Sequence, residues 1–296
     1  MNLQPGSVDE PGSRATPLFE AQHAPRYERQ QLIRDYEAKH ECCLIVVSSP
    51  IYTNSTVFVE ELVHDCAPEQ NLHLLLTSPG GDGESAVRIV RSIQQRCNEL
   101  TILLADQAKS AATLLTLGSH KILMGPFGDL GPIDPQLLLP SRDGQTQFVS
   151  AKDIIASVED ATRRIQDAPE SYTLWASLFS NITGIIVQQA RTALARSSDQ
   201  LREALAANPD RDISDIDRLV EQLKGPLIDD PKSHGAVFGF DDAIKAGLPA
   251  EKLDASGDHW HDIWRLWSRY AVMGAVDIYE GRKASQMFPT VAGAAT

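Results

Sequence analysis

Residues 72–83 read Leu-His-Leu-Leu-Leu-Thr-Ser-Pro-Gly-Gly-Asp-Gly, an apolar run that ends in a glycine-rich turn. A short, almost continuous apolar run is typical of a strand in a parallel sheet that is covered on both faces. Residues 84–97 then have apolar positions at helical spacing, and residues 101–105 (TILLA) form a second apolar run. This order of strand, turn, helix and strand predicts a βαβ unit with a right-handed crossover.

The same alternation continues on both sides of this unit. On the N-terminal side, residues 42–47 (CCLIVV) predict a further buried strand, preceded by an amphipathic helix over residues 27–40. On the C-terminal side, a short apolar helix over residues 111–117 leads to a strand over residues 121–124. The repeated alternation predicts an α/β fold with a parallel sheet and flanking helices.

The sequence changes character after residue 125. Residues 151–207 are mostly helical in pattern, and residues 240–246 predict a short helix that ends at Gly247. Farther on, Trp260, Trp264 and Trp267 occupy one face of a predicted helix. We therefore expect a helical C-terminal extension beyond the sheet.

Composition and pattern divide the chain into three parts. Residues 1–25 are rich in proline, glycine and serine, so we expect a disordered N-terminal arm. Residues 26–256 carry the α/β pattern, and residues 257–296 form a C-terminal helix and tail whose tryptophan face is a candidate oligomer contact. We expect the end of this tail, residues 291–296, to be frayed.

Charge and composition exclude several classes of protein. The 296 residues include 27 Lys and Arg against 40 Asp and Glu, a net charge of −13, which argues against nucleic acid as a partner. No apolar run approaches the ~20 residues of a membrane helix, and the N-terminus has no signal-peptide pattern. Four cysteines, Cys42, Cys43, Cys66 and Cys97, have neither metal-ligand nor disulfide-framework spacing. We expect a soluble, reduced, cytoplasmic protein without metal or cofactor.

The loop after the first quoted strand contains Gly80, Gly81 and Asp82. Ligands bind beyond the carboxyl ends of parallel strands, so this loop lies on the functional edge of the predicted sheet. Three interpretations are open. The glycines can aim backbone N–H groups at a reacting carbonyl, they can form a tight turn and no more, or Gly81-x-Gly83-x-x-Ala86 can be a dinucleotide fingerprint with Asp106 as the ribose ligand.

A second loop follows the strand over residues 101–105 and ends in Lys109-Ser110-Ala111-Ala112. Ser110 precedes an apolar helix, where small neighbours allow a substrate backbone to approach closely. A serine at this place is also a common helix N-cap. The loop is therefore a candidate for a nucleophile or for a cap.

Taken together, the two loops resemble the ClpP/SppA class of serine peptidases, which have a crotonase-like fold. Three motifs in order carry the resemblance: SPGGD at residues 78–82, AKSAATL at residues 108–114, and LGPIDPQ at residues 130–136. The closest similarity is to the SppA-like branch called the serine dehydrogenase proteinase family. A weaker match is Ser233-His234-Gly235, which resembles the family's turn before its closing helix. The resemblance implies a ClpP/crotonase-like sheet and peptide-bond hydrolysis.

The same resemblance implies roles for individual residues. Ser110 would be the nucleophile, the N–H groups of Gly81 and Ala111 would form the oxyanion hole, and Gly80 and Asp82 would contact substrate. SppA-type enzymes take their base from a lysine farther along the chain, and Lys152, among apolar neighbours, is the matching candidate.

Other side chains have weaker claims on catalysis. We expect His234 to be structural, although it could enter the site if its turn folds back. Asp134 should fix its Gly/Pro-rich turn, and Lys109 should be a loop charge or a substrate contact.

The sequence thus favours a serine endopeptidase with a Ser110–Lys152 dyad, acting on a peptide or protein substrate and assembled as a homo-oligomer. Three alternatives stay open: a catalytically inactive interaction module on the same fold, a dinucleotide-binding protein, and an acyl-CoA enzyme of the crotonase type.

Overall fold

A computed structural model describes residues 16–64, 66–140, 145–274 and 276–289 of the chain. Its main sheet has seven strands in the order β11-β10-β1-β2-β3-β5-β9. The parallel strands are β1 (Cys42–Ser48), β2 (Asn71–Thr77), β3 (Leu100–Leu104), β5 (Lys121–Met124) and β9 (Ala250–Lys252). Two antiparallel strands, β10 (Val276–Glu280) and β11 (Ser285–Pro289), extend the sheet beside β1. The predicted α/β class with a mostly parallel sheet is confirmed.

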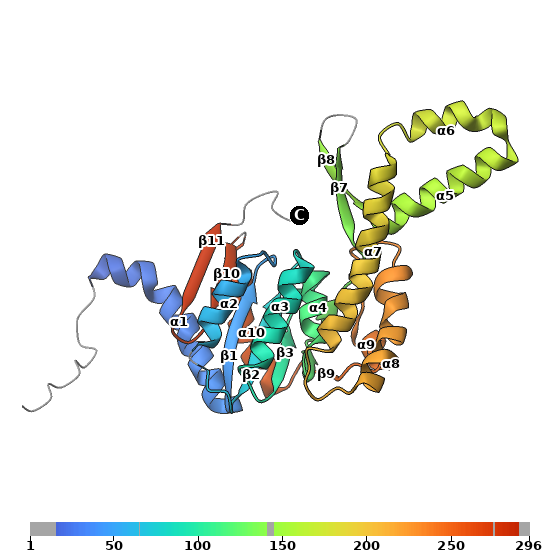
Figure 1. Ribbon diagram of the computed structural model, residues 1–296. Coiled ribbons are helices and arrows are strands. Elements are labelled where there is room, and N and C mark those ends of the chain that lie inside the picture. The colour runs from blue at the N-terminus through green and yellow to red at the C-terminus, as the bar shows by residue number, and fades with distance from the viewer. Residues whose placement is uncertain (1–15, 65, 141–144, 275, 290–296) are drawn as a thin grey trace, which may run out of the picture.

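Helices cover both faces of this sheet (Figure 1). Cys43, Ile45 and Val47 of β1 face a core that also contains residues of α2 (Ser55–Val63), α3 (Gly83–Gln94), α4 (Ala111–Leu117), α7 (Gly184–Leu205) and α8 (Ile213–Lys224). The alternate residues Leu44 and Val46 face α1 (Pro17–His40) and α10 (Asp258–Ala271). Because successive side chains of a strand point to opposite faces, a strand buried on both sides must be apolar throughout.

A smaller group of elements projects beyond the carboxyl edge of the sheet (Figure 1). It consists of the hairpin β7 (Gln136–Pro140) and β8 (Thr146–Ser150), the helices α5 (Ala151–Asp167) and α6 (Tyr172–Leu178), the single turn Pro169–Ser171 between them, and the upper part of α7. The remaining short elements are β4 (Gln107–Ala108), β6 (Asp129–Leu130), the π-helical turn Gly225–Asp229 and α9 (Phe240–Lys245).

The structure corrects several expectations. Helix α1 begins at Pro17, so residues 17–25 are helical, whereas residues 1–15 and the tail 291–296 lie outside the described residues. The C-terminal extension is helical only over α10, because the chain then turns at Gly274 and adds β10 and β11 to the sheet. The hairpin of β7 and β8 was not predicted. The proposed domain boundaries stay a prediction.

The expectation that all four cysteines are reduced is wrong for one pair. Cys43 at the start of β1 and Cys66 beyond α2 form a disulfide, with a Cα–Cα distance of 5.9 Å. Cys42 and Cys97 are free, and burial raises the pKa of the Cys97 thiol to about 11. The sequence spacing hid the pair because only the packing of α2 on the sheet brings its two cysteines together.

Candidate active site

The two loops singled out in the sequence lie side by side at the carboxyl edge of the sheet. Ser78 N donates to Gln107 O at 2.9 Å, and Lys109 N donates to Ser78 O at 3.0 Å, so the loops pair like short parallel strands. They meet because β2 and β3 are neighbours in the sheet. The expected meeting of these loops is therefore present.

Ser110 lies where α4 begins, and its backbone is strained. Its φ is +50° and its ψ is −118°, and Glu41 is the only other non-glycine residue of the described chain with positive φ. Such conformations cost on the order of 1–3 kcal/mol and gather at functional sites. The Ser110 hydroxyl makes no capping hydrogen bond to α4, so it does not act as the N-cap that was the alternative interpretation.

Gly80 packs directly against Ser110. A Cβ on Gly80 would lie 2.6 Å from Ser110 Cβ and 2.9 Å from the Lys109 carbonyl oxygen, and the φ of Gly80 is +111°. Both the contact and the backbone conformation therefore require glycine here. This close approach seats the serine side chain against the Gly-Gly turn.

The backbone N–H groups of Gly81 and Ala111 stay outside the local pairing. Ile51 donates its N–H to Gly80 O at 2.7 Å and accepts from Asp82 N at 2.8 Å, so Ile51 bonds to the two neighbours of Gly81 and not to the Gly81 amide. Ala111 is the first residue of α4, where an amide has no partner within the helix. Of the two predicted oxyanion donors, Ala111 thus directly follows Ser110 and Gly81 lies in the loop that is paired with the serine loop.

Ser110 opens into a pocket of about 330 Å³ at the base of the projecting elements. The pocket walls come from both loops, from the turn at residues 133–136, from Phe148 of β8 and from α7. His234 and Asp134 also line this pocket, although they lie far from Ser110 in the sequence. The nucleophile candidate and an imidazole therefore share one cavity.

His234 is bound to a buried carboxylate. Its Nδ1 lies 2.9 Å from Asp134 Oδ1, and Asp134 is only 1% exposed. Ser150 Oγ donates to the other carboxylate oxygen at 3.2 Å. Because an ionised carboxylate only accepts hydrogen bonds, this contact places a proton on Nδ1, so that in the neutral imidazole the acceptor is Nε2. The sequence favours structural roles for both side chains and leaves open the entry of His234 into the site.

Lys109 is a buried link between the serine loop and the histidine turn, not a loop charge. Its Nζ donates to Asp129 Oδ2 at 2.6 Å, to Leu130 O at 3.0 Å and to Ala236 O at 3.3 Å. The residue is 8% exposed. Since Ala236 follows His234 by two positions, this lysine ties the backbone next to Ser110 to the turn that presents the imidazole.

Lys152, the base expected from the sequence, lies in the first turn of α5. Its ammonium donates to the carbonyl oxygen of Pro231, and the residue is not among those that line the Ser110 pocket. Asp82 caps α3, since its Oδ1 accepts from Ser85 N at 2.7 Å. The base assignment of Lys152 stays a prediction, and its observed partner is a backbone oxygen.

The tryptophan face of α10 packs mainly against the sheet. Trp260 is buried, and Trp267 Nε1 donates to Thr77 Oγ1 at 3.0 Å. Phe127 makes edge contacts to all three indoles, and Trp264 stays 40% exposed. Most of this face is therefore core, and its role as an oligomer contact stays a prediction.

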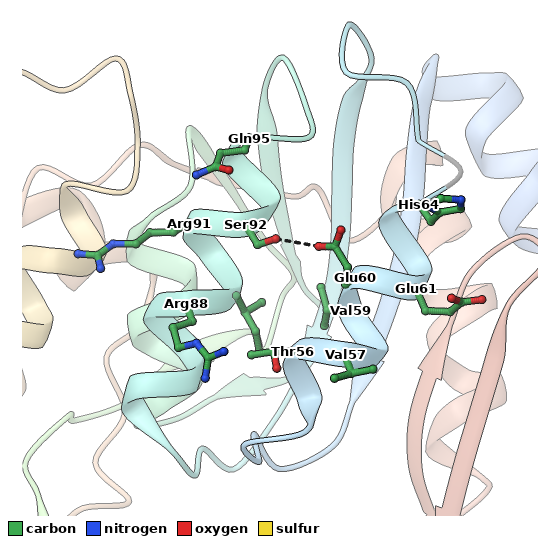
Figure 2. Close-up of a pocket in the computed structure, with 11 residues that line it drawn as sticks. Thr56, Val57, Val59, Glu60, Glu61, His64, Arg88, Arg91, Ser92 and Gln95 are labelled. Carbon is green, nitrogen blue, oxygen red and sulfur yellow. Dashed lines mark hydrogen bonds between the residues drawn. The ribbon is translucent and has the colours of Figure 1, made fainter.

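A separate hollow of about 630 Å³ lies between α2 and α3, away from Ser110 (Figure 2). Glu60 from α2 accepts a hydrogen bond from Ser92 of α3 at 2.9 Å and pairs with Arg96. Arg91 pairs with Glu203 of α7. Glu60 and Arg91 thus link helices to one another, and none of the predicted site residues lines this hollow.

Within the described residues, no helix is both long and apolar enough to span a bilayer. The same residues contain no group of three or more histidine, cysteine or carboxylate side chains arranged to hold a metal ion.

Comparison with known proteins gives limited likeness. No family model matches the chain. An uncharacterized protein of Methanocaldococcus jannaschii is 28% identical over 92 residues, which are 30% of this chain and 32% of that protein. The chain therefore spans about a third of the length of the curated relative it matches.

Among the solved structures that share limited likeness with this chain are three peptidase structures. Two variants of the membrane-bound stomatin-specific protease 1510-N each have a TM-score of 0.31; one is 23% identical and covers 41% of this chain and 60% of its own. The other variant, in complex with a substrate peptide, is 26% identical. The match covers 38% of this chain and 54% of the chain of that protease. A peptidase from Plasmodium falciparum is 14% identical, with a TM-score of 0.38, and covers 71% of this chain and 95% of its own.

Proposed function

We propose that this chain is a serine peptidase with Ser110 as nucleophile. One observation carries the proposal: a strained serine whose hydroxyl does not cap its helix rests against a Gly-Gly turn, in a pocket shared with a histidine that is bound to a buried aspartate. A plain helix cap would require neither the strained backbone nor the shared imidazole. A nucleophile, a base and an orienting carboxylate are the groups that acyl transfer needs, and candidates for all three line this one pocket.

In the proposed reaction, Ser110 Oγ bonds to the peptide carbonyl carbon while His234 Nε2 takes the hydroxyl proton. The oxyanion accepts hydrogen bonds from the amides of Gly81 and Ala111. When the C–N bond breaks, His234 returns the proton to the leaving amine and an acyl ester remains on Ser110. Water then attacks this ester while His234 takes a proton from it. The C–O bond to Ser110 breaks as His234 returns that proton to Ser110 Oγ, and the new carboxylic acid is released. Asp134 holds the imidazole in the required tautomer.

The geometry favours His234 over Lys152 as this base. His234 lines the pocket and its Nδ1 is bound to Asp134, whereas the Lys152 ammonium donates to the Pro231 carbonyl. The dyad of Ser110 and Lys152 stays the competing assignment. Because the two candidate bases are different side chains on different elements, substituting each one separately distinguishes them in a single activity assay.

The test is the rate of labelling of the full chain by a fluorophosphonate, together with hydrolysis of a fluorogenic peptide library. Ser110→Ala should abolish labelling. His234→Gln should slow it at least ~10²-fold, in the range expected for loss of a general base, and imidazole should partly rescue His234→Ala. Lys152→Met should label within a few-fold of the parent.

Other outcomes identify the alternatives. Loss of labelling in Lys152→Met but not in His234→Gln would assign the base to Lys152. An unlabelled parent that hydrolyses no peptide would support the inactive interaction module and overturn the proposal. Self-association, expected from the sequence, stays a separate prediction for sedimentation analysis.

A further inference from the structure

A second hollow, of about 610 Å³, adjoins the candidate active site on the other side of the Gly-Gly turn. Gly81 lines both this hollow and the Ser110 pocket. The hollow lies over the carboxyl end of β1 and beside β10 and β11, so it continues the functional edge of the sheet. We call it the Gly81 side pocket.

Aromatic rings form much of the wall of the Gly81 side pocket. The ring of Phe58 lies 5.0 Å from the ring of Tyr279 and 5.0 Å from the ring of Phe288, measured between centroids. Tyr52 completes the wall, and its hydroxyl donates to Asp277 Oδ2 at 3.4 Å. Such walls accommodate a long aliphatic stem, and their faces attract a cation at its end.

Among the residues that the structure describes, the charged side chains that line the Gly81 side pocket are carboxylates. Asp82 stands at its rim beside Gly81, and Asp277 lies in its wall. Among the described residues, no lysine or arginine lines this pocket or the Ser110 pocket, while Asp134 adds a carboxylate to the latter. The net charge of −13 has the same sign. Both pockets therefore favour a cationic ligand and disfavour an acidic one.

We propose that the Gly81 side pocket receives the side chain of the substrate residue whose carbonyl is attacked, and that this residue is lysine or arginine. The inference rests on the proposed function, because the Gly81 amide must hold that carbonyl oxygen. A residue held there sits at the junction of the two pockets. Its stem packs on the aromatic wall, and its charged end meets the carboxylate of Asp277.

The test uses two peptidyl diphenyl phosphonates that differ only in the residue bonded to phosphorus, lysine or the uncharged norleucine. The parent should react with the lysine probe about tenfold faster or more, as a close charge pair near a protein surface allows. Asp277→Asn should reduce this ratio below about threefold. Asp167→Asn, which removes the same charge from an exposed position at the end of α5, should keep the parent ratio.

The outcomes separate this inference from the proposed function. A ratio near one in a parent that fluorophosphonate still labels on Ser110 would overturn the side-pocket assignment and leave the peptidase proposal standing. A lysine preference that Asp277→Asn fully retains would also overturn it. Failure of fluorophosphonate to label the parent would remove both proposals. If thermal melting shows that Asp277→Asn does not fold, the ratio of the lysine and norleucine rates in the parent alone tests the side-pocket assignment.

Discussion

Replacing Gly80 by alanine should cripple the site while leaving the fold intact. The new Cβ would lie 2.6 Å from Ser110 Cβ, whereas carbon atoms normally approach to about 3.5–4.0 Å, so Ser110 must shift by roughly 1 Å. A displacement of that size at a reacting group can cost about 10²-fold in rate. The φ of +111° adds backbone strain of about 2 kcal/mol for a residue with a Cβ, which should lower Tm by roughly 4–8 °C.

The assay for Gly80→Ala is the second-order rate of fluorophosphonate labelling beside a thermal melt. Gly184→Ala is the matched control, because a Cβ on Gly184 at the start of α7 would meet nothing within 4 Å. The control should label and melt like the parent. Labelling of Gly80→Ala at the parent rate, with an unchanged Tm, would refute the close packing on which the site depends.

Two further predictions concern the stability of the frame. Burial lowers the pKa of His73, whose Nδ1 contacts the Tyr36 hydroxyl, to about 4, so this imidazole stays neutral in the native state. Stability present above pH 6.5 should therefore fall as the pH drops toward 4. His73 alone should contribute a loss on the order of 2 kcal/mol to the free energy of unfolding between pH 7 and pH 5, so His73→Gln should lose less than the parent in urea unfolding. Equal losses would contradict the burial argument. Lys109→Met should cost about 3 kcal/mol in urea unfolding, because it leaves Asp129 charged and poorly solvated without its partner, and it should also slow labelling. Parent-like unfolding and labelling would show that the Lys109 link to the histidine turn has no effect.

Local patterns predicted the frame of the site well. The strands β1, β2 and β3 could be predicted from their apolar runs, because a strand that is buried on both faces must be apolar throughout. The two loops follow neighbouring strands, so their meeting follows from the topology. Three features of the site could not be read from the sequence pattern. They are the strained backbone of Ser110, its contact with Gly80, and the absence of a capping bond from its hydroxyl to α4.

Contacts between distant segments could not be predicted in the same way. His234 and Asp134 are 100 positions apart, and each stands in a turn where a structural role is the commoner explanation. One signal in the sequence could have suggested the contact. Asp134 follows the helix after Ser110 and His234 precedes the closing helix, and neither residue had an assigned catalytic partner. The Gly81 side pocket depends on β10 and β11, which were hidden because the helical pattern of α10 was continued too far.

The central claim is that the Ser110 hydroxyl is a nucleophile served by the His234 imidazole. Peptide mass spectrometry of the fluorophosphonate-treated chain tests it most directly, by locating the adduct while the labelling rate is followed from pH 5 to pH 9. A single adduct on Ser110 is expected, formed faster as one group loses its proton, and this pH dependence should be lost in His234→Gln. An adduct on another residue, or a pH profile that His234→Gln leaves unchanged, would contradict it.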